Sequence, residues 1–212
     1  MFVVTIDQIG SRVVGDRVDG LLVMLDTLAE GSTQVRRSIV RAFDRTVGDE
    51  VQGALDDPVA VVDLALTVLR TGRWSIGIGA GEVATPLPAS VRAAQGPAFV
   101  AAREAVEAAK SRARAVPLAV RGRDDEAAAD AEAVLALVGA VRDRRSDAGW
   151  QAVDALAARP WATQEEVAAA LGVSQQAVSQ RLRTALWGEE LAARAAAARL
   201  LARAEGRVGG DR

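Results

Sequence analysis

The stretch "RTVGDEVQG", residues 45–53, decides the interpretation of the first half of the chain. It joins two segments, "SIVRAFDRTV" and "EVQGAL", that carry the valine, isoleucine and phenylalanine typical of β-strands. Between them, Gly48 and Asp49 form a dipeptide that favours the tight turn of a hairpin. An aspartate at a hairpin tip serves either the turn itself or a metal ion, and the sequence leaves both interpretations open.

The segments on either side of this hairpin alternate between strands and helices. Residues 2–7 are apolar and strand-like, and residues 15–31 repeat leucine and methionine at the spacing of an amphipathic helix. The glycines of "WSIGIGAGEV" suggest a strand that another backbone approaches closely. The whole order predicts an α+β fold with a ferredoxin-like antiparallel sheet and its helices on one face. The remaining predicted elements are helices at residues 57–70 and 96–113 and strands at residues 74–83 and 116–122.

The second half of the chain has a different character. After Gly122 the sequence is alanine-rich and helical, and the acidic run that begins at Asp124 favours the start of a helix. We therefore predict two domains, residues 1–122 and an all-α domain of residues 123–212. Its helices are predicted at residues 124–141, 147–158 and 189–205, with a helix-turn-helix at residues 163–186.

The helix-turn-helix is the strongest functional signal. Thr163 and Glu166 have the spacing of a capping box, Gly172 suits a turn that needs a positive φ, and Ser174 suits the cap of a second helix. Amide side chains recognise adenine edges and arginine recognises guanine or phosphate, so the second helix predicts DNA binding. A helical hairpin that only packs is the alternative. The predicted DNA-binding residues are Gln175, Gln176, Ser179, Gln180, Arg181 and Arg183.

Composition excludes several classes of site. The chain of 212 residues has no cysteine and no histidine, which excludes disulfides, Cys-zinc sites, thiol catalysis and a Ser-His-Asp triad. Lys110, the sole lysine, lies in an alanine-rich helix rather than a glycine-rich loop, so a Walker-type phosphate site is excluded. The net charge of −2 gives no global attraction to nucleic acid. No secretory signal or long apolar run is present, and we expect a cytoplasmic protein without a membrane partner.

Four stretches in the first domain resemble, in order, the core motifs of class III nucleotide cyclases: "VTIDQIGS", "RTVGDEVQG", "WSIGIGAGEV" and "GPAFVAAREA". The resemblance implies a nucleotide-cyclase-like fold, metal binding by Asp7 and Asp49, and nucleotide contacts by Arg45 and Arg103. The Gly10-Ser11 turn offers amides to a phosphate, which adds Ser11. Mg²⁺ with a nucleotide is thus the candidate cofactor.

The chain departs from the cyclase pattern at one motif. "GPAFVAAR" is one residue shorter than the family's motif between glycine and arginine and has Val100 near the place of its asparagine. The arginine is therefore shifted by about 100° around the helix. With no histidine and a distant lysine, no substitute is evident, and we assign no catalytic residue.

A closer resemblance is to the SatD family of small bacterial proteins. It rests on "IGSRVVGDR", "TVGDEVQG", "IGIGAGEV" and "GPAFVAARE", and covers most of the first domain. The second domain resembles the helix-turn-helix of MarR-like and sigma-like regulators, above all in "QQAVSQRLR".

Three hypotheses follow. The first is a regulator that binds double-stranded DNA, with a non-catalytic cyclase-like domain for dimerisation or nucleotide sensing. The second is a metal-dependent nucleotide-binding or nucleotide-converting enzyme that uses Asp7 and Asp49, and the third is an adaptor with protein partners only. The last helix has an apolar stripe that serves either a homodimer or packing within its own domain: Leu191, Ala195, Ala198 and Leu201. The arginines expected to meet phosphates are Arg142, Arg144, Arg145, Arg159, Arg181, Arg183 and Arg194.

Overall fold

The computed structural model describes residues 1–206; the last six residues of the predicted second domain lie outside that range. The described chain forms a mixed α+β structure with five strands and ten α-helices. The strands are β1 (Phe2–Gln8), β2 (Ile39–Arg45), β3 (Glu50–Leu55), β4 (Trp74–Ala80) and β5 (Leu118–Gly122). The helices are α1 (Ser11–Val14), α2 (Val18–Gly31), α3 (Thr33–Ser38), α4 (Pro58–Leu69), α5 (Pro97–Ala109), α6 (Asp125–Asp143), α7 (Asp147–Ala158), α8 (Gln164–Leu171), α9 (Gln175–Thr184) and α10 (Trp187–Ala204), with a 3-10 turn η1 (Val91–Ala93).

The five strands form one sheet in the order β2-β3-β1-β4-β5. The predicted hairpin joins β2 to β3, and Gly48 at its tip has a φ of 62°. The expectation of a wholly antiparallel sheet was wrong at one edge, where β4 and β5 are parallel. The reason is α5, which carries the chain back along the sheet so that β5 starts at the same end as β4.

Helices cover both faces of the sheet, so the prediction of helices on one face was also wrong. Along β1, Phe2, Val4 and Ile6 face the main core, which is shared with α2, α4, α6 and α10. The alternate residue Val3 packs on the other face with α5. A strand between two helical layers is buried on both sides, and residues 2–6 are all buried, with Thr5 as the one polar residue among them.

Helix α5 lies directly on the backbone of β4. A Cβ atom added at Gly77 would lie 2.2 Å from the backbone nitrogen of Val106, and one at Gly79 would lie 2.1 Å from the carbonyl oxygen of Ala98. No larger residue fits at either glycine, which confirms the close approach that the sequence suggested. These contacts fix α5 along β4 and β1 and so fix what each end of α5 can reach.

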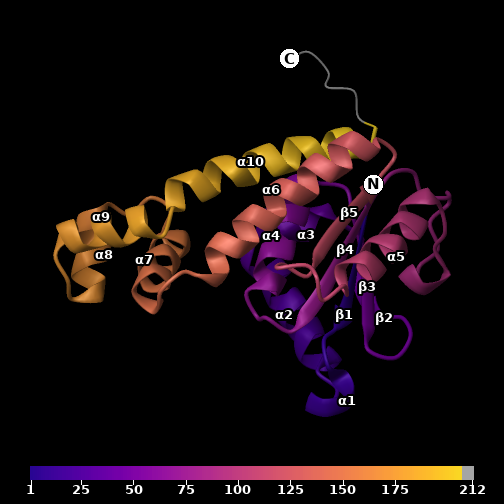
Figure 1. The fold of residues 1–212 in the computed structure, drawn as a ribbon, viewed down its shortest axis with the longest axis horizontal. Coiled ribbons are helices and arrows are strands. Elements are labelled where there is room, and N and C mark those ends of the chain that lie inside the picture. The colour runs from indigo at the N-terminus through magenta and orange to yellow at the C-terminus, as the bar shows by residue number, and fades with distance from the viewer. Residues whose placement is uncertain (207–212) are drawn as a thin grey trace.

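Helices α6 and α10 run side by side across the sheet (Figure 1). Leu135 of α6 and Leu201 of α10 are fully buried in the main core. The predicted domain boundary at residue 122 assigns α6 and α10 to the second domain, although both helices pack on the sheet of the first. Of the predicted apolar stripe on α10, Ala198 and Leu201 pack inward, whereas Leu191 is 47 % exposed.

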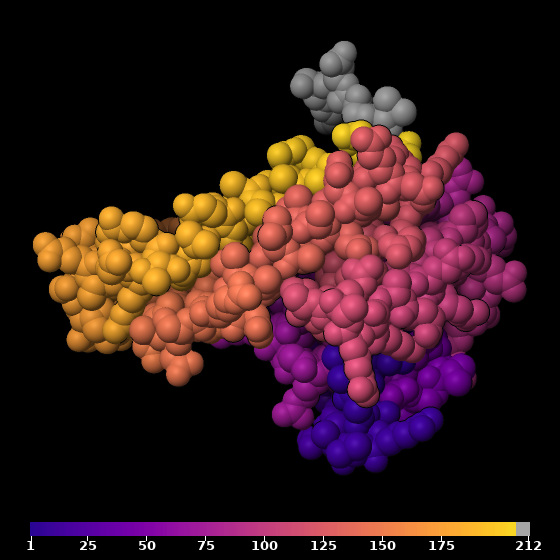
Figure 2. Space-filling model, viewed as in Figure 1, coloured from indigo at the N-terminus to yellow at the C-terminus, as the bar shows by residue number. Residues whose placement is uncertain are grey.

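Helices α7, α8 and α9 form a small lobe (residues 147–184) with a core of its own. Val153 of α7, Val167 of α8 and Val178 of α9 are buried against one another. The lobe stands out from the molecule at the N-terminal end of α10 (Figures 1 and 2).

A buried cluster of charges joins the lobe to the rest of the protein, the sheet with the helices that cover it, which we call the sheet domain. Glu190, whose side chain is 1 % exposed, accepts hydrogen bonds of 2.5 Å from both Arg142 and Arg145. Arg194 approaches the same carboxylate to 3.7 Å. We call Glu190 and these three arginines the junction cluster. It joins the end of α6, the residues before α7 and the start of α10.

Trp150 of α7 packs beside the junction cluster. The guanidinium carbons of Arg70, Arg145 and Arg142 lie 3.7, 4.5 and 4.8 Å from the centre of the Trp150 ring, distances at which cations are attracted to an aromatic face. Arg70 also donates two hydrogen bonds of 2.7 Å to Asp154. The lobe is thus held to the end of α4 as well as to α6 and α10.

The junction cluster carries more positive than negative charge. Burial opposes ionisation of Glu190, but the surrounding guanidinium groups outweigh it and lower the pKa of this carboxyl. Burial also lowers the pKa of Arg142, and the neighbouring Arg194 and Arg145 add to that effect. One carboxylate therefore compensates Arg142 and Arg145, and its loss would leave both without an acidic partner, whereas Arg194 would keep Asp63 at 3.5 Å.

We predict that Glu190→Ala lowers the free energy of unfolding by about 3–5 kcal/mol, because it removes one partner of a buried ion pair. Glu189→Ala, at the exposed neighbouring position, should change it by less than about 0.5 kcal/mol. Glu190 has a lowered pKa in the folded state, so its contribution is complete above the ordinary glutamate value of 4.5 and is lost as the pH falls below it. Urea unfolding at several pH values measures both effects. Equal losses for the two variants would contradict this account.

Candidate functional site

The two ends of α8 have the geometry that the sequence predicts. Thr163 Oγ1 accepts from the backbone N–H of Glu166 at 3.2 Å, and Glu166 Oε2 accepts from the backbone N–H of Thr163 at 2.7 Å. This reciprocal capping box starts α8. Gly172 ends α8 with a φ of 65°, a conformation that favours glycine.

Helix α9 has an apolar side and a polar side. Ser174 caps it by accepting from the N–H of Ala177 at 3.2 Å. Val178 and Leu182 are buried in the lobe. Its ten residues, 175–184, include no aspartate or glutamate. Of the predicted DNA-binding residues, Gln175, Gln176, Gln180 and Arg183 are exposed, whereas Ser179 and Arg181 are half-buried.

The structure corrects the set of arginines expected to meet phosphates. Arg142 and Arg145 are buried in the junction cluster, and Arg194 is largely covered beside them. The side chains of Arg142 and Arg145 contact Glu190, and that of Arg194 lies between Glu190 and Asp63, so none of the three is presented to a ligand. The sequence could not reveal this, because Glu190 follows Arg142 by 48 residues. Arg144, Arg159 and Arg183 remain exposed.

The end of the sheet near the hairpin carries the two aspartates that the cyclase resemblance implied as metal ligands. Asp7 on β1 pairs across the strands with Glu50 on β3, next to Asp49 at the hairpin tip. Lys110, which the sequence placed far from this site, lies with its ammonium nitrogen 3.1 Å from Asp7 Oδ1. It also lies 2.7 Å from Glu107 Oε1. The expectation of a distant lysine was therefore wrong.

The surroundings of Asp7 oppose its ionisation. Burial raises the pKa of Asp7 above its ordinary value, and repulsion by Asp49 and Glu50 raises it further, while the hydrogen bond and charge of Lys110 act in the opposite direction. The pKa of Lys110 is raised: burial lowers it, but Glu107 and Asp7 outweigh burial. Asp7 thus depends on Lys110 for its charge compensation.

This arrangement does not fit a metal site. Mg²⁺ requires near-octahedral oxygen coordination, and Lys110 already contacts one of the two predicted ligands. Glu50 Oε1 accepts a hydrogen bond of 2.6 Å from the hydroxyl of Thr46. Among residues 1–206, no group of three or more acidic, histidine or cysteine side chains is placed to hold a metal ion.

The three residues that we expected to contact a nucleotide do not share a common set of contacts. Arg45 donates hydrogen bonds to Asp16 at 2.7 and 3.0 Å and to the carbonyl of Gly48 at 3.1 Å, so it fastens the hairpin to the segment before α2. This contact lowers the pKa of Asp16. Ser11 begins the short helix α1. Arg103, on α5, lines a cleft.

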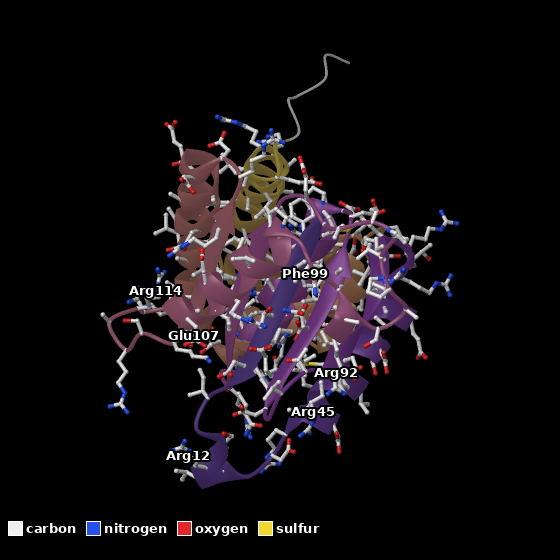
Figure 3. The ribbon with its side chains drawn as sticks, turned by 90° about the vertical axis from the view of Figure 1, so that its right-hand side faces the viewer. Arg12, Arg45, Arg92, Phe99, Glu107 and Arg114 are labelled. Carbon is white, nitrogen blue, oxygen red and sulfur yellow. The ribbon has the colours of Figure 1, made fainter. Side chains whose placement is uncertain are left out.

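The cleft has a volume of about 840 Å³ and lies between α5, the β2–β3 hairpin and the segment that precedes α5. Figure 3 looks onto this side of the molecule, where Phe99, Arg92 and Arg45 follow one another down the view. Gln52, in its wall, donates a hydrogen bond of 2.8 Å to the Thr5 hydroxyl. The cleft thus combines an aromatic ring, amides and arginines. Its lining residues are Thr46, Val47, Glu50, Gln52, Arg92, Ala94, Gln95, Gly96, Pro97, Phe99, Val100 and Arg103.

One known protein family matches nearly the whole chain. The model of the SatD family matches residues 2–201. The chain belongs to the SatD family. The SatD match covers the lobe and α10 as well as the sheet, so it is longer than the resemblance in the first domain alone. Searches of curated proteins and of solved structures found no match. In the described part of this SatD protein, no helix is long and apolar enough to cross a membrane.

Proposed function

We propose that this SatD protein is a DNA-binding, transcriptional regulator-like protein whose lobe is a helix-turn-helix unit. In this proposal the sheet domain is a ferredoxin-like, cyclase-related module that does not catalyse cyclisation. The observation that carries the proposal is the exposed side of α9. It offers three glutamines and an arginine without any acidic residue, on a helix whose other side is buried.

The dimensions of α9 support this proposal. A helix of ten residues is about 15 Å long, and the major groove of B-DNA is about 12 Å wide, enough to admit a helix. In helix-turn-helix proteins the second helix of the motif enters this groove, with its N-terminal residues on the base edges. Gln175 and Gln176 lie in the first turn of α9. Together with Gln180, four residues after Gln176, they are the candidates for base contacts, whereas Arg183 near the other end is a candidate for phosphate.

The small number of exposed arginines available for phosphate contacts suggests that two copies of the protein bind one DNA duplex. Three of the seven arginines expected to meet phosphates lie in the junction cluster, and the acidic residues Glu165 on α8 and Glu189 on α10 are exposed. Weak electrostatic attraction makes binding by one lobe weak. A homodimer that places two lobes on half-sites one helical turn apart would strengthen it. The exposed part of the α10 stripe, Leu191 and Ala195, is the candidate contact.

We predict that Gln176→Ala and Gln180→Ala each weaken discrimination between DNA sequences by about 5-fold to 150-fold, the value of a bidentate contact to a base. Arg183→Ala should weaken binding to all sequences and reduce the slope of log K against log salt by about 1. Selection from random duplexes, followed by anisotropy titrations at several salt concentrations, measures both. The same titrations give the number of chains per duplex.

Gln151→Ala provides the control, because Gln151 is an exposed glutamine on α7 outside the predicted interface. This variant should select the same DNA sequences as the parent protein. The proposal fails if no motif is enriched and no salt-sensitive binding is found. Such a result would favour an adaptor with protein partners only.

Nucleotide binding in the cleft is a second candidate, because Arg103 lines that cleft together with Arg92 and Phe99. An aromatic ring and two guanidinium groups suit a planar base and an anionic group. We do not extend this candidate to metal-dependent conversion at Asp7 and Asp49, since neither residue lines the cleft and Lys110 contacts the first of them.

If the cleft binds ATP or GTP, Arg103→Ala should weaken binding about 10-fold or more, the loss of one charge-assisted contact. Arg112→Ala, at an exposed position beyond α5 and outside the cleft lining, should leave binding unchanged. Calorimetric titration without divalent ions measures this. Equal affinities of the two variants, or no binding by the parent protein, would reject the candidate.

A further inference from the structure

Lys110 is the sole lysine of the chain. It follows α5 directly and caps its C-terminal end, with its backbone N–H donating to the carbonyl of Val106 at 3.2 Å. Positive charge is favourable at a helix C-terminus. Because Gly77 and Gly79 hold α5 against β4, this end of α5 lies over the end of β1 where Asp7 stands. The lysine therefore reaches Asp7 through the packing of the fold.

The end of β1 needs a cation. Asp7 and Glu50 are direct cross-strand partners, and like charges in that relation destabilise a sheet. Asp7 is only 17 % exposed, so water compensates its charge poorly. The next carboxylate, Asp49, is near enough to repel it. Lys110, at 3.1 Å, supplies the positive charge from within the chain.

A lysine suits this task better than an arginine. Its ammonium group is a compact charge with three donors, similar in its single centre of charge to a small metal ion. Here it meets two carboxylates, Asp7 at 3.1 Å and Glu107 at 2.7 Å. A divalent ion that approached Asp7 would first have to displace this group.

We propose that Lys110 is an internal counter-ion that takes the place of a divalent metal ion at Asp7, so that this SatD protein needs no metal at the end of its sheet. The cyclase resemblance implied a metal at this aspartate; the chain supplies an ammonium group there instead. It follows that removal of the ammonium group leaves the carboxylates open to Mg²⁺, and that the folded protein then becomes dependent on it.

The test is thermal unfolding of the full chain with and without Mg²⁺, at matched ionic strength in NaCl. Lys110→Met keeps the length of the side chain and removes its charge. It should lower the Tm by about 2–4 °C, the shift that corresponds to a modest ion pair in a chain of this size. Mg²⁺ should restore the Tm of this variant and leave the parent protein unchanged. Arg112→Met, at an exposed position two residues away, should show neither effect.

Two further measurements separate the outcomes. In Lys110→Met/Asp7→Asn, the aspartate charge is gone, so the response to Mg²⁺ should disappear and stability should recover without metal. Calorimetric titration of the parent protein with Mg²⁺ should show no binding that depends on Asp7. The proposal is overturned if the parent protein binds Mg²⁺ and Asp7→Asn abolishes it. It is equally overturned if Lys110→Met loses stability that Mg²⁺ does not restore, or loses none.

Discussion

The position of the lobe depends on one buried carboxylate. Glu190 lies at the start of α10 and receives hydrogen bonds of 2.5 Å from Arg142, near the end of α6, and from Arg145, in the connection from α6 to α7. Without it, the guanidinium groups of Arg142 and Arg145 would be buried with no negative partner, a cost that proteins rarely sustain. The arginines that stack on Trp150 and the pair between Arg70 and Asp154 extend the same contact to α4. The sheet domain can therefore hold α9 in one orientation, which a helix that reads a groove requires.

Strand β1 and the β2–β3 hairpin bring acidic residues to one end of the sheet, but the cation that contacts Asp7 comes from the end of α5. Asp7 and Asp49 lie near each other, as the sequence predicts, yet the group that compensates Asp7 is Lys110. Arg45, expected at a nucleotide base, instead fastens the hairpin to Asp16. The features that would serve a ligand on this side of the molecule lie in the cleft beside Arg103. We infer that the contacts at the hairpin are structural, while the lobe carries the candidate recognition surface.

Local rules predicted the local structure well. The capping box at Thr163, the positive φ of Gly172 and the buried side of α9 follow from side chains within a few residues of one another. The glycines of β4 likewise predicted the close contact with another backbone. Three errors concern contacts between distant segments: the face of the sheet that α5 covers, the partner of Lys110 and the burial of Arg142 and Arg145. Charge at a sequence position does not show whether a carboxylate 48 residues away will enclose it. The short helices α1 and α3 were missed because each is six residues or fewer, too short for an apolar period to appear.

Residue-level mapping of the DNA contact tests the central claim most directly. Backbone amide shifts of the isotope-labelled protein would be followed by NMR as a duplex of about 20 base pairs, two helical turns, is added at low salt. The account predicts that changes concentrate in residues 175–183 and in the first turn of α8, with the α5 cleft and the Lys110 contact undisturbed. Changes confined to the cleft, or none in α9 while binding is detected, would contradict it.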